Sequence, residues 1–256
     1  MGHVLAPKYG RDESRRDRGV ATGRAPPRRY VIVERRSTGP LRCAVVDPGD
    51  ADAVLEALRD LREQHYDLQD DGTPRPEPVL VVTALLVTHK HWDHQAGVRK
   101  VLRVERPRTK AHASLTEEDA AAAAAADAAD DAADARLAAT PGEIAVVAGE
   151  NEPVKHVTHR AADGARFRVG ATLDVEVVPA PCHTKGHVMF GLVGADGARI
   201  EALFTGDALF CGGCGAPFEG DAKDVARNFR ALRVRRADTS LMMHRGDAAA
   251  STWKVR

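Results

Sequence analysis

The stretch Thr88-His89-Lys90-His91-Trp92-Asp93-His94 is the most informative in this chain, because it places four side chains of metal-ligand type within six positions. It follows Val79–Val87, a nearly continuous apolar run that is typical of a strand buried on both faces. In an extended segment the side chains at 89 and 91 point the same way, which leaves 93 and 94 to reach a second point. Polar residues bonding locally at a strand end would explain one or two of these side chains. The four together predict a loop that serves two neighbouring ions.

Three further donors follow apolar runs elsewhere in the chain, namely His183, Asp207 and His244. Imidazole and carboxylate groups suit zinc, iron or manganese. Each donor comes where a predicted strand ends, and a sandwich of two sheets would gather such positions at one edge. His244 alone would fit a solvated or helix-capping histidine equally well. As part of the set, it indicates a metal ligand.

Short apolar or β-branched runs separated by glycines predict two strand-rich halves, each with helices. The expected strands are 30–33, 41–46, 79–87, 166–169, 173–178, 188–193 and 202–205, and the expected helices are 51–65 and 221–232. This pattern predicts an α/β chain, more narrowly α+β, in which two sheets lie between helical layers.

Two segments differ in composition from the rest. Residues 1–29 carry eight basic residues against three acidic ones and little apolar content, which predicts a disordered basic tail. An organelle transit peptide, mitochondrial for example, is the alternative. An alanine-rich stretch at about 116–140 is expected to be a helical surface insertion without a catalytic part. The folded domain is therefore predicted to span 30–256.

The overall composition limits the classes of partner. Thirty-seven basic residues balance thirty-seven acidic ones, so no global field favours nucleic acid or an anionic membrane surface. No apolar run approaches the roughly 20 residues that span a bilayer, and the N-terminus has no apolar signal region. Four cysteines in 256 residues do not make a disulfide framework, which favours a reducing, cytoplasmic compartment. The sequence carries no signal for the oligomeric state.

The motifs THKHWDH, PCHTKGH, FTGDALF and MMHRGD, in this order, resemble those of the metallo-β-lactamase superfamily. The tryptophan of the first motif and the loop Gly213–Gly220 narrow the resemblance to hydroxyacylglutathione hydrolases (glyoxalase II), and among these to the PNKD-like branch. The resemblance implies an αββα sandwich with a dinuclear metal centre. It also implies hydrolysis of S-acyl glutathione thioesters, as in methylglyoxal detoxification, by a hydroxide that bridges the metals.

The resemblance also implies a role for each matching residue. One ion would be held by His89, His91 and His183, the other by Asp93, His94 and His244, and Asp207 would bridge them. Asp93 would help to orient the nucleophile, while Asp47 and His187 would orient the ligands. Zinc is the first choice of metal, with iron or manganese as alternatives.

The substrate loop at Ala216, Pro217 and Phe218 departs from the family pattern. Glyoxalase II enzymes usually place a lysine and a tyrosine at the positions of Ala216 and Phe218, and they carry a C-terminal helical domain that also binds glutathione. This chain ends twelve residues after His244, so that domain is expected to be lacking. A different substrate, weak affinity or an incomplete chain would each account for these departures.

Two other functions are compatible with the same fold. A persulfide dioxygenase would use one iron held by two histidines and an aspartate, and Trp92, His187 and the complete ligand set argue against it. A non-catalytic regulatory protein would not need every ligand, although the altered substrate loop is compatible with it.

Overall fold

The computed structural model describes residues 3–5, 30–34, 41–64, 80–111, 142–170, 172–210, 212–234, 239–243 and 253–254. The alanine-rich stretch at about 116–140, His244 and most of the N-terminal 29 residues lie outside these ranges. The predicted domain boundaries therefore stay predictions.

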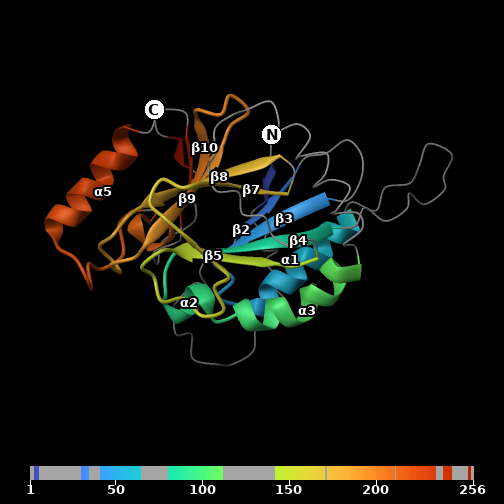
Figure 1. Cartoon of the computed structure of the whole chain (residues 1–256). Coiled ribbons are helices and arrows are strands. Elements are labelled where there is room, and N and C mark those ends of the chain that lie inside the picture. The colour runs from blue at the N-terminus through green and yellow to red at the C-terminus, as the bar shows by residue number, and fades with distance from the viewer. Residues whose placement is uncertain are drawn as a thin grey trace, which may run out of the picture.

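Two mixed six-stranded sheets form the centre of the molecule (Figure 1). In the first, the strands lie in the order β1 (His3–Leu5), β2 (Tyr30–Val33), β3 (Leu41–Val46), β4 (Leu80–Val87), β5 (Ala145–Gly149) and β6 (His159–Ala161). Strands β3 to β6 pair in parallel, and β1, β2 and β3 pair antiparallel. Strand β1 lies within the stretch predicted to be disordered, where the backbone of residues 3–5 pairs with β2.

The second sheet has the order β12 (Trp253–Lys254), β11 (Ser240–Met242), β10 (Ile200–Phe204), β9 (Val188–Val193), β8 (Leu173–Pro179) and β7 (Arg166–Val169). Its neighbours are antiparallel, apart from the parallel pair β10 and β11. Because β8, β10 and β11 run in one direction, the chain leaves all three at the same edge.

Successive side chains of a strand point to opposite faces of the sheet, so each strand contributes to two layers of the core. In β2, Ile32 belongs to the cluster between the sheets with Phe190 and Phe204. Its neighbours Val31 and Val33 face the opposite way, toward the helices. Burying one such side chain contributes about 1.5–3 kcal/mol, so turning β2 over, which would exchange its two faces, is unfavourable.

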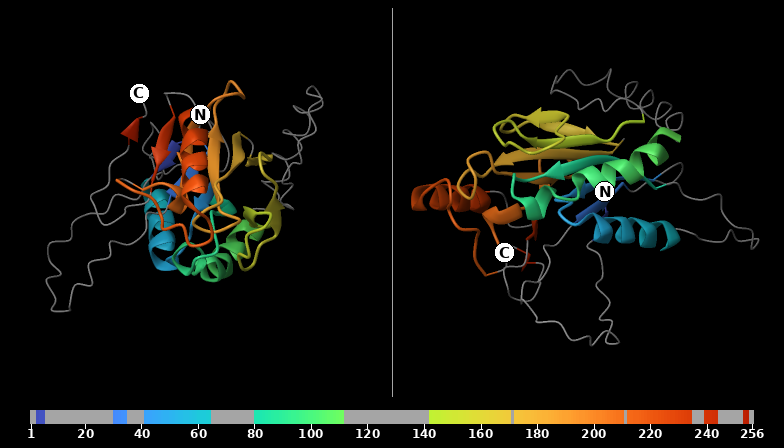
Figure 2. Two further views of the ribbon diagram at one scale, coloured as in Figure 1. Left: turned by 90° about the vertical axis from the view of Figure 1, so that its left-hand side faces the viewer. Right: turned by 90° about the horizontal axis from the view of Figure 1, so that it is seen from below.

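Helices cover the outer faces of the two sheets (Figures 1 and 2). Helices α1 (Ala51–Gln64) and α3 (Val98–Ala111) pack on the first sheet. Helix α5 (Ala222–Val234) contributes Leu232 to the cluster on the second sheet. The predicted αββα arrangement is confirmed. No helix in the described ranges combines the length and apolarity needed to cross a bilayer.

Turns at one edge of both sheets position the candidate site. Strand β3 ends before Asp47 and β4 before Thr88, and the Asp47 amide donates to the Leu86 carbonyl at 2.8 Å. The two sheets are joined there, since the Val188 amide donates to the Thr88 carbonyl at 3.0 Å. The short helix α2 (Trp92–Gln95) and the 3-10 turn η1 (Gly206–Ala208) follow at the same edge.

Candidate metal centre

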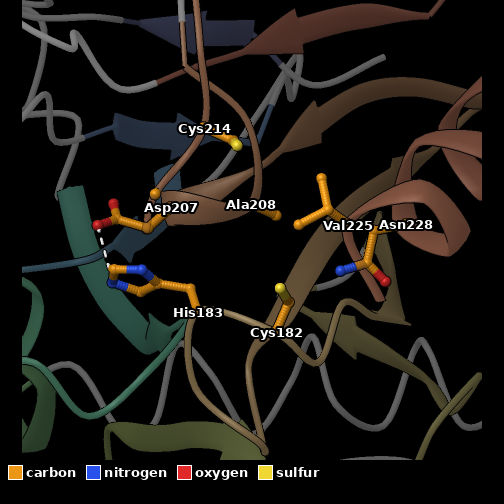
Figure 3. A pocket seen from close by; sticks show the side chains of 8 residues that line it. Cys182, His183, Asp207, Ala208, Cys214, Val225 and Asn228 are labelled. Carbon is orange, nitrogen blue, oxygen red and sulfur yellow. Dashed lines mark ion pairs between the residues drawn. The ribbon is translucent and has the colours of Figure 1, made fainter. Parts of the chain in front are cut away.

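Four of the predicted ligands converge on one point. His89, His91, His183 and Asp207 each offer a donor atom, and these atoms all lie within 4.8 Å of one another. His91 Nδ1 lies 3.0 Å from His89 Nε2 and 2.8 Å from His183 Nε2. Asp207 Oδ2 lies 3.1 Å from His183 Nε2, the pair joined by the dashed line in Figure 3. Three imidazoles and a carboxylate form a donor set that suits a divalent metal ion.

A second group adjoins the other oxygen of Asp207. His94 Nε2 lies 3.1 Å from Asp207 Oδ1 and 3.8 Å from Asp93 Oδ2. The two carboxylate oxygens of Asp207 therefore face different sets of side chains. The third predicted member of this second set, His244, lies outside the described residues, and strand β11 ends at Met242, two positions before it.

Asp47 fixes the orientation of two histidines. Its Oδ2 lies 3.0 Å from His94 Nδ1. Thr88 donates its amide to Asp47 Oδ1 at 2.8 Å and its hydroxyl to Oδ2 at 2.9 Å, and Thr88 Oγ1 lies 3.1 Å from His89 Nδ1. Both imidazoles thereby turn Nε2 toward the centre. Metal-binding histidines are commonly oriented in this way by a partner on their other ring nitrogen. Asp47 itself has a φ of 51°, a left-handed conformation that costs about 1–3 kcal/mol for such a residue.

Two further contacts set the positions of His183 and Asp207. His183 Nδ1 donates to the Ala216 carbonyl at 2.8 Å, which leaves Nε2 for the centre. The Asp207 amide donates to Nε2 of the buried His187 at 3.1 Å. Ala216, predicted to contact substrate, thus acts on the site through its backbone, which a reading of side-chain types does not reveal.

Burial and charge set the protonation of these groups in the metal-free protein. Burial lowers the pKa of His89 well below its ordinary value and that of His187 to about 3, so both are neutral near pH 7. Burial also acts to lower the pKa of His94, but Asp47 and Asp207 outweigh it and raise that pKa to about 10. Burial acts to raise the pKa of Asp207, yet hydrogen bonds from His183 and His94 hold it far below its usual range. The site therefore keeps an ionised Asp207 beside a neutral His89, both in the form that binds metal, whereas His94 is protonated near pH 7 and has to release a proton when metal binds.

An exposed aromatic side chain, Phe218, flanks this centre. Phe218 is 70% exposed, and Trp92, which follows His91 in the chain, is 73% exposed. The Phe218 ring centroid lies 5.2 Å from that of His183 and 5.9 Å from that of His91. Ala216 and Pro217 are exposed on the same loop. The predicted substrate loop therefore borders the histidine cluster.

A hollow extends from this centre toward helix α5 (Figure 3). In the figure, His183 and Asp207 face each other on one side, and Val225 and Asn228 of α5 lie on the other. The remaining residues around it are Cys182, Ala208, Cys214 and Gly215. It offers a mainly apolar space directly beside two of the predicted ligands.

Gly49 permits a close contact behind the centre, which gives a testable prediction. A Cβ atom at Gly49 would lie 1.5 Å from the Asp93 carbonyl oxygen. Gly49→Ala must therefore displace the loop that carries Asp93 and His94, and overpacking of this kind costs about 1–3 kcal/mol. We expect a lower melting temperature and a reduced metal content. Gly164→Ala is the control for metal content, because nothing lies within 4 Å of a Cβ there, while its φ of 77° should by itself lower the melting temperature. Unchanged metal content in Gly49→Ala would contradict this account.

Relatives of the chain share both the sequence pattern and the fold. It is 28% identical to the cytoplasmic hydroxyacylglutathione hydrolase of Arabidopsis thaliana, over 77% of this chain and 54% of that protein. It is 32% identical to a hydroxyacylglutathione hydrolase of a Synechococcus species, over 82% of this chain and 60% of that protein. The chain thus spans little more than half the length of these curated relatives.

Solved structures show the same architecture at lower identity. The crystal structure of ETHE1 from Myxococcus xanthus superposes with a TM-score of 0.57 and 18% identity, over 88% of this chain and 74% of that one. A metallo-beta-lactamase from Staphylococcus aureus superposes with a TM-score of 0.52 and 18% identity, over 86% of this chain and 52% of that one. The model of the metallo-beta-lactamase superfamily matches residues 29–244, which contain every predicted ligand. The chain belongs to the metallo-beta-lactamase superfamily.

Proposed function

We propose that this protein is a metal-dependent hydrolase of S-acyl glutathione-type thioesters. It holds two divalent cations, and zinc is the first choice of metal. The observation that carries the proposal is the position of Asp207, whose Oδ2 lies 3.1 Å from His183 and whose Oδ1 lies 3.1 Å from His94. A carboxylate with one oxygen toward each of two histidine sets is suited to bridge two ions. The names of the relatives support the thioester substrate.

In this proposal the ligands divide as the resemblance to the family implies. His89, His91 and His183 would hold one ion, and their Nε2, Nδ1 and Nε2 atoms face one another. Asp93, His94 and His244 would hold the other, with Asp207 between the two sets. His94 offers Nε2, because its Nδ1 lies against Asp47.

The reaction needs a nucleophile, a stabilised carbonyl oxygen and a leaving group. When bound, divalent cations lower the pKa of a water molecule to about 7 and polarise a carbonyl. Asp93, whose side chain is 39% exposed, would accept a hydrogen bond from the attacking water and orient it. Thr88, Asp47 and the Ala216 carbonyl keep the imidazoles from rotating. The thiol leaves as a thiolate with a pKa near 8.5, so it needs little help from a general acid.

The same geometry weighs against a site for one iron held by two histidines and an aspartate. Three imidazoles gather with Asp207 around one point, and His94 stands on the opposite oxygen of that carboxylate. The likeness to ETHE1, at 18% identity, concerns the fold alone. We therefore propose zinc-dependent hydrolysis of a thioester in preference to iron-dependent oxidation.

His94→Ala tests the second ion. The purified wild type should contain about two divalent ions per chain, and the variant should lose mainly one, because His89, His91 and His183 remain in place. Elemental analysis after gel filtration measures this directly. His159→Ala, at a partly exposed histidine in β6, should leave the metal content unchanged. A wild type that holds one ion and hydrolyses thioesters would rule out the dinuclear assignment.

A further inference from the structure

Glu152 is a buried carboxylate in the turn after β5, and it contacts both loops that carry the converging histidines. Only 1% of the residue is exposed. Its Oε1 accepts the Lys90 amide at 2.7 Å and the Thr184 hydroxyl at 2.8 Å. Lys90 lies between His89 and His91, and Thr184 directly follows His183. One oxygen atom therefore joins the loop after β4, in the first sheet, to the loop after β8, in the second.

We propose that Glu152 is a positioning residue that sets the separation of His91 and His183 and thereby the affinity of the first metal site. This inference rests on the proposed function only in treating these two histidines as ligands. Their facing nitrogens lie 2.8 Å apart, and the ligand loops belong to different sheets. A link between the loops helps to hold that separation, and the Glu152 carboxylate makes one through a single buried oxygen.

The turn that carries Glu152 is itself held in place. The Glu152 amide donates to the Gly149 carbonyl at 3.0 Å. Its carbonyl accepts the Val154 amide at 2.8 Å and the Arg160 guanidinium at 2.7 Å. The carboxylate therefore projects from a fixed base, and burial removes the competition with water that weakens exposed contacts.

Gly186 allows the second loop to approach this carboxylate. A Cβ atom at Gly186 would lie 2.5 Å from Glu152 Oε2 and 2.7 Å from the backbone of Asn151 and of Glu152. Two of these neighbours are main-chain atoms that cannot rotate away. The loop of His183 therefore fits against the Glu152 turn only with glycine at this position.

Glu219 gives an internal comparison, since it joins the same two loops from the solvent side. Its Oε1 pairs with Lys90 Nζ at 2.5 Å, and its Oε2 accepts the Lys185 amide at 2.8 Å. The Lys90 and Glu219 side chains are 29% and 30% exposed, and this link runs through a flexible lysine side chain. We expect it to constrain the loops less than Glu152, which binds the Lys90 backbone.

The test measures metal affinity in the full-length chain, with Co²⁺ and Zn²⁺ as the probes and no substrate. Loss of a partner that orients metal ligands typically weakens binding about 10–100-fold, so Glu152→Ala should raise the dissociation constant of the first ion at least about tenfold. It should also shift the visible spectrum of the Co²⁺ protein. Glu152→Gln should stay close to wild type, because its amide oxygen can accept both hydrogen bonds. Glu150→Ala, at an exposed position of the same turn, is the matched control.

Wild-type affinity and spectrum in Glu152→Ala would overturn the proposal, and so would Glu152→Gln binding as weakly as Glu152→Ala. If Glu152→Ala does not fold, Thr184→Val removes one of the two contacts and should weaken metal binding to a smaller degree. Wild-type affinity in Thr184→Val would then overturn the proposal. A protein that binds metal normally but hydrolyses no thioester would refute the proposed function and leave this result standing.

Discussion

Replacing Asp207 by asparagine should reduce thioester hydrolysis about a thousandfold. Asp207 contributes one oxygen to each of the two proposed ligand sets, so the substitution weakens both and removes the negative charge between them. Metal ions stabilise transition-state charge by several kcal/mol, and about 4 kcal/mol corresponds to about a thousandfold in rate. Steady-state assays of kcat/KM, together with elemental analysis, measure the loss.

Asparagine is the informative replacement because it keeps the shape of the side chain. The Asp207 amide can still donate to His187, so the turn that carries the residue should persist. Asp163→Asn, in an exposed turn, is the control and should keep full activity. An Asp207→Asn protein with two ions and more than a tenth of the wild-type rate would show that this carboxylate does not bridge.

The double substitution Ala216→Lys with Phe218→Tyr should lower the KM for S-lactoylglutathione about tenfold and change kcat little. It restores the cation and the hydroxyl that glyoxalase II enzymes usually have in this loop. A hydrogen bond to a charged group contributes about 1.5–3 kcal/mol, and each 1.4 kcal/mol is about tenfold in affinity. The metal ligands are untouched, so the chemical step should not suffer.

The geometry of the loop makes this substitution possible. Ala216 holds His183 through its carbonyl, which a lysine retains, and the Phe218 side chain is 70% exposed, which leaves room for a hydroxyl. Ala162→Lys, which adds a cation at an exposed turn, should not change the KM. If the double variant behaves as wild type while the wild type already has a micromolar KM, another surface holds the glutathione peptide.

The fold was predictable where apolar runs are long and local. Val79–Val87 predicts a buried strand, and β4 is buried on both faces because the second sheet covers one face and helices α1 and α3 cover the other. Helix α3 was not anticipated, since Pro107 lies inside it and its sequence is strongly charged. Its position depends on tertiary contacts, including the ion pair of Arg62 with Glu105 at 2.7 Å. These two residues are 43 positions apart in the sequence, so no local sequence pattern indicates their contact.

The candidate site was predictable in its residue types but not in its supports. Histidine and aspartate at strand ends indicated the donors, and the structure gathers His89, His91, His183 and Asp207. The backbone contact of Ala216 leaves no trace in the sequence. Glu152 stands in the run Glu150-Asn151-Glu152, where it resembles any surface carboxylate until the two ligand loops are seen around it. Both metal-ligand sets stay predictions, and His244 of the second set lies outside the described residues. The cytoplasmic location is likewise a prediction.

Metal reconstitution of the chain, followed by a thioester assay, tests whether the protein is a metal-dependent thioester hydrolase. Chelator-treated protein should be folded and inactive toward S-lactoylglutathione. Added Zn²⁺ should restore hydrolysis, and the rate should rise until about two ions are bound per chain. Hydrolysis that survives complete metal removal would rule out a metal-dependent hydrolase, and a protein that holds two ions and cleaves no thioester would rule out the proposed substrate class.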